Sequence, residues 1–317
     1  MKTITKKTKN LFGLAVVASL FLFSKCGKDP VPPTPPTIVE TVVASADLSL
    51  LKFAVLRAGL ATTLNSPNLT VFAPTDAAFA AAGYADTNAI KTIPIAALTS
   101  ILSYHVLPSV IKSGDVPVGP NASVNSFLAS NTIFTTRNTA GVFINGSAVT
   151  TADIIAANGV VHKINALLLP PSGNIVTTLV ANNKYKLLVQ AALKCGLDGA
   201  LSGAGPLTLF APDNAAFIAA TFDSSTIANA SPATIGVLTN VLKLHVFGGR
   251  AFSNDITNGG TIPTLFTPKT LTTTISGGMV TIKETTNTAL TAANITAVNK
   301  VTTNGVIHDV SKVIMPL

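Results

Sequence analysis

The sequence of 317 residues has no tryptophan, two cysteines and only 11% charged residues. Two cysteines are too few for the disulfide frameworks that hold small secreted domains together. The sequence also lacks the Gly-x-Ser-x-Gly, Gly-x-x-x-x-Gly-Lys-Ser/Thr and His-Glu-x-x-His motifs of hydrolases, nucleotide-binding proteins and metalloproteases. No His-x-x-x-His or Cys-x-x-Cys spacing indicates a metal site. We therefore predict a protein that is not an enzyme and that uses no cofactor or metal.

Basic residues outnumber acidic ones by 21 to 13, but much of this excess lies at the N-terminus. Four lysines precede an apolar run from Leu11 to Phe23, a pattern typical of a signal peptide and too short for a stable membrane-spanning helix. Cleavage after residue 25 would remove five lysines and no acid, and the formal net charge would fall from +8 to +3. The remaining chain has no basic cluster, so we expect no nucleic-acid partner.

A cysteine, Cys26, stands three residues after the end of the apolar run. Such a cysteine is where a bacterial lipoprotein is cut and acylated, although Lys25 stands where a small residue is usual. We predict a lipoprotein-type signal peptide at residues 1–25, lipidation of Cys26 and a membrane-anchored location in the bacterial cell envelope, at the outer membrane, where the anchored chain faces either the periplasm or, surface-exposed, the exterior. Simple cleavage without lipid is the alternative. Residues 26–36 are predicted to be a proline-rich stalk, in which Asp29–Pro36 should form an extended polyproline segment of roughly 25 Å.

Three sequence blocks occur twice, in the same order. The block Leu69–Phe79 recurs as Leu207–Phe217, Leu102–Val106 as Leu242–Val246, and Asn158–His162 as Asn304–His308. The repeat has the length of a whole domain rather than of a solenoid unit. We predict two tandem domains, at residues 37–170 and 171–317.

Each repeat begins with helical patterns and ends with β-hairpin patterns. Apolar residues follow a helical spacing before Gly59 and again before Gly196, and Cys195 lies on the second of these stripes. Strand patterns flank Asn145-Gly146 in the first repeat and Gly277-Gly278 in the second. The fold class is therefore α+β, with helices covering sheets in both domains. Cys195 is expected to be a buried structural thiol.

The blocks Thr70–Phe79, Tyr104-His105 and Asn158–His162 with Ile164 resemble the three landmark motifs of the fasciclin (FAS1) domain family. The resemblance covers both predicted domains. It implies a wedge of β-strands with several helices, which is used in tandem on extracellular adhesion proteins. Ten positions are identified as structural motif residues by this pattern: Phe72, Pro74, Asp76, Phe79, His162, Phe210, Pro212, Phe217, His245 and His308.

The resemblance also implies binding candidates, because adhesion in animal members is assigned to a Tyr-His region and to an Asp-Ile motif. Tyr104 and His105 match the first, whereas the second domain has Leu244 in place of the tyrosine. Asp255 and Ile256 match the second weakly. The opposing interpretation is structural: a histidine among leucines and valines usually hydrogen-bonds to backbone, and Asp76 or Asp213 can cap helices.

Two functions follow as hypotheses. The first is a non-enzymatic adhesion or interaction lipoprotein that binds an extracellular protein of the matrix or of a neighbouring cell. The alternative is a component that binds envelope polysaccharide. The absence of tryptophan and the presence of only three tyrosines weaken the glycan hypothesis, because sugar sites commonly use aromatic platforms.

Overall fold

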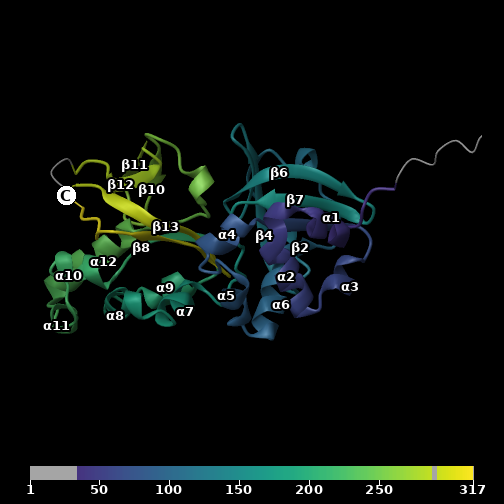
Figure 1. Cartoon of the computed structure of the whole chain (residues 1–317). Helices are drawn as coiled ribbons and strands as arrows, with labels where there is room; N and C mark the ends of the chain where they lie inside the picture. The colour runs from purple at the N-terminus through teal and green to yellow at the C-terminus, as the bar shows by residue number, and fades with distance from the viewer. Residues whose placement is uncertain (1–33, 288–290, 317) are drawn as a thin grey trace, which may run out of the picture. The chain divides into compact units, whose positions relative to one another are not determined.

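The computed structural model describes residues 34–287 and 291–316, and in this part of the chain every helix and strand of the first repeat has a counterpart in the second (Figure 1). The first domain contains α1 (Ile38–Ala44), η1 (Ala46–Leu48), α2 (Ser49–Ala58), α3 (Ala61–Leu64), β1 (Leu69–Pro74), α4 (Asp76–Ala81), α5 (Thr87–Lys91), α6 (Ile95–Tyr104), β2 (Val106–Leu107), η2 (Ser113–Asp115), β3 (Gly119–Asn125), β4 (Thr132–Asn138), β5 (Gly141–Ile144), β6 (Ser147–Ala156) and β7 (Gly159–Ile164).

The second domain repeats this order. It contains α7 (Ile175–Val180), η3 (Asn183–Tyr185), α8 (Lys186–Lys194), α9 (Asp198–Ser202), β8 (Leu207–Pro212), α10 (Asn214–Ala219), α11 (Ser224–Ala228), α12 (Pro232–Leu244), β9 (Val246–Phe247), η4 (Ser253–Asp255), β10 (Thr261–Pro263), β11 (Thr270–Ser276), β12 (Met279–Glu284), β13 (Ala293–Thr302) and β14 (Gly305–Val310). The predicted α+β class with two tandem domains is confirmed.

Each domain has one seven-stranded sheet, with the order β2-β1-β7-β6-β5-β4-β3 in the first and β10-β11-β12-β13-β14-β8-β9 in the second. The named strands pair antiparallel except β1 with β7 and β8 with β14, which are parallel. These parallel pairs bring the landmark blocks together, because Phe72 lies opposite His162 and Phe210 opposite His308. Five residues of β14 and all six of β1 are buried, as is typical of strands covered on both faces.

Local sequence sets where the helices begin and end. Thr37 and Glu40 form a capping box at α1, and Ser231 caps α12 with proline at the first helical position. Gly59 ends α2 with a φ of 69°, a left-handed conformation that favours glycine. The helix patterns that the sequence predicts before Gly59 and Gly196 are confirmed as α2 and α8.

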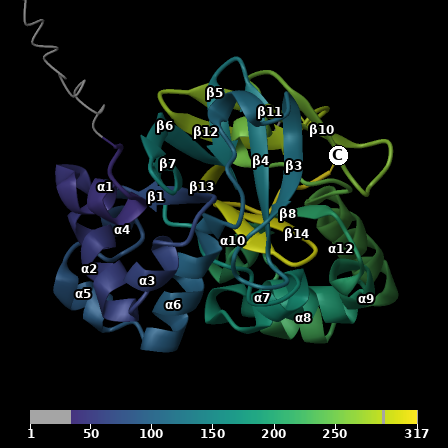
Figure 2. The same ribbon diagram turned by 90° about the vertical axis from the view of Figure 1, so that its right-hand side faces the viewer.

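Each domain has two apolar clusters, one among the helices and one inside the strands. In the second domain the helices α7–α12 lie on one side of β8 and β14, and the strands β10–β12 lie on the other (Figure 2). The helical cluster includes Leu188 and Phe217, and the strand cluster includes Phe210, Leu244 and Ile256. The central parallel strands therefore supply side chains to both clusters.

The two predicted hairpins exist, as β5–β6 and β11–β12, but they are not equivalent. By strand order β11–β12 corresponds to β4–β5, so the Asn145-Gly146 turn has its counterpart between β12 and β13. Cys26 and the predicted signal peptide lie outside the described residues, and the predicted domain boundaries stay predictions. Among the residues that the structure describes, no helix is both long and apolar enough to span a membrane.

Candidate functional site

Tyr104, the first binding candidate, is a buried residue at the end of α6, with no exposed side-chain surface. Its hydroxyl donates a hydrogen bond to the carbonyl of Thr132 at 2.9 Å and accepts one from Asn145 Nδ2 at 2.9 Å. Burial raises the pKa of Tyr104 to about 12, although the Asn145 hydrogen bond and the charge of Arg250 oppose this. A partner cannot touch this side chain while the domain is folded.

His105 is also buried, with 2% exposure, and both ring nitrogens contact backbone. Nε2 accepts from the Leu168 N–H at 3.0 Å, so Nδ1 carries the proton and donates to the Ile101 carbonyl at 2.8 Å. His245 makes the same bonds, with Ile314 at 2.9 Å and Val241 at 2.8 Å. Burial lowers the pKa of each of these histidines to about 4. Each ring therefore links, through hydrogen bonds, the segment after the last strand of its domain to the C-terminal end of α6 or α12.

The other histidine pair lies on the parallel strands β7 and β14. The Nε2 atoms of His162 and His308 contact the carbonyls of Ile111 and Ala251, both at 2.9 Å. The rings also stack on the phenylalanines of the neighbouring strands, with centroids 5.9 Å apart for Phe72 and 5.6 Å for Phe210. In the described part of the chain no cluster of three His, Cys, Asp or Glu residues could hold a metal ion.

Asp76 differs from its expected role in one respect. Thr75 caps α4 through the Ala78 N–H at 3.3 Å, whereas the Asp76 carboxylate accepts from Ser49 Oγ at 2.7 Å and the Leu50 N–H at 2.8 Å. It therefore caps α2 rather than its own helix. In the second domain Asp213 caps α10 and Asn214 accepts from the Leu187 N–H at 3.0 Å, which repeats this arrangement.

The remaining motif residues belong to the core or end the strands. Phe79 and Phe217 are completely buried in the helical clusters, and Phe72 and Phe210 are buried in the strand clusters. Pro74 and Pro212 are the last residues of β1 and β8. Cys195, by contrast, is only partly buried, as a free thiol packed against the second helical cluster.

Asp255 and Ile256 belong to the turn at η4. One Asp255 oxygen accepts from the Phe252 N–H at 2.9 Å, and burial raises the pKa of this carboxyl despite its hydrogen bonds. Ile256 is 7% exposed and packs in the strand cluster. The first domain has the same turn at Asp115, followed by buried Val116. The binding role of these candidates stays a prediction, and the structure gives each a place in the fold.

A contact within the compact unit Pro35–Leu317 joins the two domains. The Arg250 guanidinium lies 3.8 Å from the centroid of the Phe134 ring, and the Arg250 carbonyl accepts from Asn121 Nδ2 at 2.8 Å. Phe134 also contacts Phe252, with centroids 6.1 Å apart. No local sequence pattern connects Arg250 with a phenylalanine more than a hundred residues earlier, so this contact could not be predicted from sequence.

The Asn145-Gly146 turn provides a second contact between the domains. A Cβ atom at Gly146 would lie 2.4 Å from Asn299 Nδ2, so only glycine fits against this side chain. Asn299 is itself fixed, since it accepts from the Ser253 N–H at 2.8 Å and donates to Ser253 Oγ at 2.7 Å. Tyr104 thus supports, through Asn145, a turn that contacts the second domain. Leu244 takes the equivalent position in the second domain and packs in its strand cluster.

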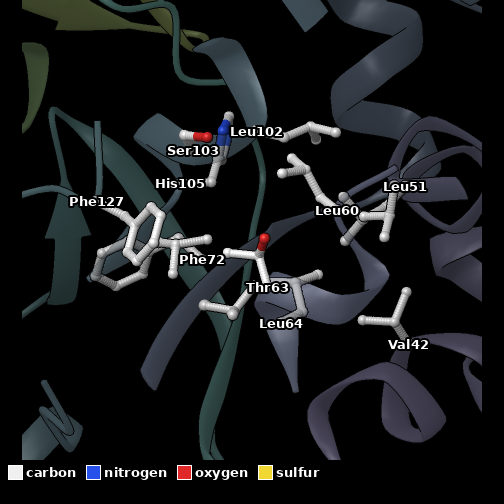
Figure 3. A pocket seen from close by; sticks show the side chains of 13 residues that line it. Val42, Leu51, Leu60, Thr63, Leu64, Phe72, Leu102, Ser103, His105 and Phe127 are labelled. Atoms are coloured by element: carbon white, nitrogen blue, oxygen red, sulfur yellow. The ribbon is translucent and has the colours of Figure 1, made fainter. Parts of the chain in front are cut away.

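Two hollows are candidates for ligand sites. An apolar one among α1, α2, α3, α6 and β1 has Phe72 and Phe127 on one side and Leu51 and Leu60 on the other (Figure 3). Its volume of about 20 Å³ is far below the size of ligand pockets. A cleft of about 660 Å³ lies between the β5–β6 turn, the segment after β7, the end of α7, η4 and β13. Of these two hollows, the cleft is the one with room for a ligand.

Comparison with known proteins identifies the family. The fasciclin domain profile matches residues 46–170 and again residues 183–316. These two matches cover most of the chain, which therefore belongs to the fasciclin domain family, and fasciclin domains are known in cell-adhesion proteins.

Two relatives illustrate the range of the family. The chain is 29% identical over 217 residues to transforming growth factor-beta-induced protein ig-h3 of Oryctolagus cuniculus, a match that covers 68% of this chain but only 30% of the rabbit protein. It is 37% identical over 138 residues to protein sll1483 of Synechocystis sp., covering 43% of this chain and 74% of that protein. This chain thus matches less than a third of the length of the rabbit relative.

A solved structure is similar as well. It is described as a FAS1 domain pair from the insect cell adhesion molecule Fasciclin I, and the match covers 85% of this chain and 97% of that chain with 16% identity. The TM-score is 0.42, a likeness too low to carry an argument about function.

Proposed function

We propose that this chain is an exported, non-enzymatic interaction protein that presents two fasciclin domains to a matrix or neighbouring-cell component. The observation that carries the proposal is the membership of both domains in the fasciclin family. The hydrogen bonds of the four histidines support it. In each ring both nitrogens bond to backbone groups, so no ring nitrogen is free for acid–base chemistry.

The proposed anchor is a lipid on Cys26 in the bacterial cell envelope, at the outer membrane. Its support is the order of basic residues, apolar run and cysteine at the start of the sequence. Metabolic labelling with a radioactive or clickable fatty acid tests this directly. Wild type and Cys195→Ala should take up label and sediment with membranes, whereas Cys26→Ala should do neither. Unchanged membrane retention of Cys26→Ala would reject the anchor.

Binding of residues 35–317 to an array of matrix proteins and glycans tests the interaction role. Specific, saturable binding without turnover of the bound component is the expected result. An array on which nothing binds above a denatured control would argue against the role.

The polysaccharide hypothesis keeps one specific observation in its favour. The cleft of about 660 Å³ is lined by many amide and hydroxyl side chains, and such groups match the donors and acceptors of sugar hydroxyls. No aromatic ring lines this cleft, so a bound sugar would have to be held by hydrogen bonds and aliphatic contacts rather than by stacking.

A further inference from the structure

The cleft beside the Asn145-Gly146 turn has the size and the chemistry of a binding site. Its volume of about 660 Å³ falls within the range of roughly 300 to 1,000 Å³ that is usual for ligand pockets, which often lie at domain interfaces. Nine of its eighteen lining residues carry an amide, a hydroxyl or an ammonium group, and none carries a carboxylate. We propose that this cleft binds an acidic saccharide, with Lys300 taking a uronic-acid carboxylate and side-chain amides taking the hydroxyls.

Two asparagines present donors that are held in place. Asn165 Oδ1 accepts from Ser147 Oγ at 2.9 Å and from the Ala148 N–H at 2.8 Å, and Asn182 Oδ1 accepts from the Lys184 N–H at 3.1 Å. These bonds fix the amide planes. Within the described residues neither Nδ2 group has a hydrogen-bond partner, so both remain available to acceptor oxygens of a ligand.

Lys300 gives the cleft its charge. It is an exposed residue of β13 and takes part in none of the ion pairs of the described residues. Its Nζ atom lies 5.8 Å from the centroid of the Tyr185 ring, a weak contact. The carboxylate at that ring, Asp309, already contacts the Tyr185 hydroxyl and the Lys184 ammonium. An ammonium in a cleft without carboxylates favours an anionic ligand over a neutral one.

The walls also offer apolar surface to the C–H groups of a sugar ring. Leu169 is 54% exposed and Val298 is 46% exposed, and they line the cleft from different domains. The contacts of Arg250 with Phe134 and of Gly146 with Asn299 hold these walls together without a ligand. A preformed site of this kind loses little entropy when it binds.

This inference rests on the proposed interaction role and names its partner class. The test is calorimetric titration of residues 35–317 with a galacturonic acid trimer and with the same trimer after reduction of its carboxyl groups. Lys300→Gln removes the charge, and Lys283→Gln on β12, away from the cleft, is the matched control. Ala181→Phe places a ring into the cleft from an exposed position. Thermal melting shows that each variant is folded.

Wild type and Lys283→Gln should bind the acidic trimer with equal affinity. Lys300→Gln should bind it about tenfold more weakly, and Ala181→Phe should show no measurable binding. The reduced trimer should bind wild type and Lys300→Gln alike. The proposed site would be wrong if Lys300→Gln and Lys283→Gln lost equal affinity for the acidic trimer. It would also be wrong if Ala181→Phe bound the trimer as tightly as wild type. If the acidic trimer fails to bind while a protein on the array binds, the cleft assignment fails and the interaction role stands. If nothing binds, both fail.

Discussion

Asn145 Nδ2 donates a hydrogen bond to the hydroxyl of Tyr104 at 2.9 Å, across 41 residues of sequence. The same hydroxyl donates to the Thr132 carbonyl, so the end of α6 is tied both to β4 and to the turn between β5 and β6. That turn contacts Asn299 of the second domain through Gly146. The landmark tyrosine therefore acts inside the protein, where it supports a contact between the domains.

Removing the Tyr104 hydroxyl should destabilise the protein. In Tyr104→Phe the buried Asn145 amide and Thr132 carbonyl lose a partner, and the free energy of unfolding should fall by about 1–3 kcal/mol. Urea denaturation of residues 35–317 measures this. Tyr84→Phe is the control, because no hydrogen bond to the Tyr84 hydroxyl exists in the described structure. Equal stability of the two variants would contradict the role given to Tyr104.

Replacing Asp76 should weaken the start of α2. Asp76→Ala removes the acceptor of the Ser49 and Leu50 N–H groups, and a lost cap costs about 0.5–2 kcal/mol. Asp76→Asn should retain most of the stability, because Asn214 fills the same role in the second domain. Thermal melting of the two variants makes the comparison. An asparagine variant as unstable as the alanine variant would show that the carboxylate has another role.

Arg250→Ala should loosen the contact between the domains. The variant loses the guanidinium over the Phe134 ring, an interaction worth about 0.5–2 kcal/mol. Small-angle scattering should give a larger radius of gyration, and urea unfolding should become less cooperative. Arg57→Ala is the control, since Arg57 bonds only to carbonyls of its own domain. Identical scattering from wild type and Arg250→Ala would refute the contact in solution.

Acid should destabilise the protein through its buried histidines. His105, His245 and His308 have pKa values lowered from 6.5 to about 4 because burial penalises the charged ring. As the pH falls below 6.5 the unfolded chain takes up protons that the folded chain does not. Stability is thus complete above pH 6.5 and is lost progressively towards pH 4. Urea midpoints across this range test the slope, and a flat profile would contradict neutral buried rings.

Gly159, the first residue of β7, should tolerate no replacement by a larger residue. A Cβ at Gly159 would lie 2.0 Å from the Leu69 carbonyl oxygen, and one at Gly305 would lie 2.1 Å from the Leu207 oxygen. The parallel neighbour strand approaches too closely for any side chain. Gly159→Ala should therefore yield little soluble protein, whereas Gly114→Ala, where nothing lies within 4 Å, should express normally. Comparable yields of the two variants would rule out the clash.

The two tandem domains, their helices and their hairpins could be predicted from the sequence. Apolar spacing, helix caps and turn residues each depend on only a few neighbouring residues. The site was less predictable from sequence. Asp76 was only a candidate cap for its own helix, and its carboxylate instead accepts from the Leu50 N–H at the start of α2, 26 residues earlier. Arg250 and Phe134 belong to different domains, so their contact depends on how the domains pack, which no local sequence pattern indicates. The burial of Tyr104, in contrast, had a signal in its apolar neighbours Leu102, Val106 and Leu107.

In the role proposed for this protein, Tyr104 and His105 serve the fold and exposed surface binds the partner. The most direct measurement compares the affinity of wild type and Tyr104→Phe for the partner that the array identifies, at a temperature where both are fully folded. We expect equal affinity together with a lower urea midpoint for Tyr104→Phe. A large loss of affinity with an unchanged midpoint would contradict it, because the tyrosine would then contact the partner itself.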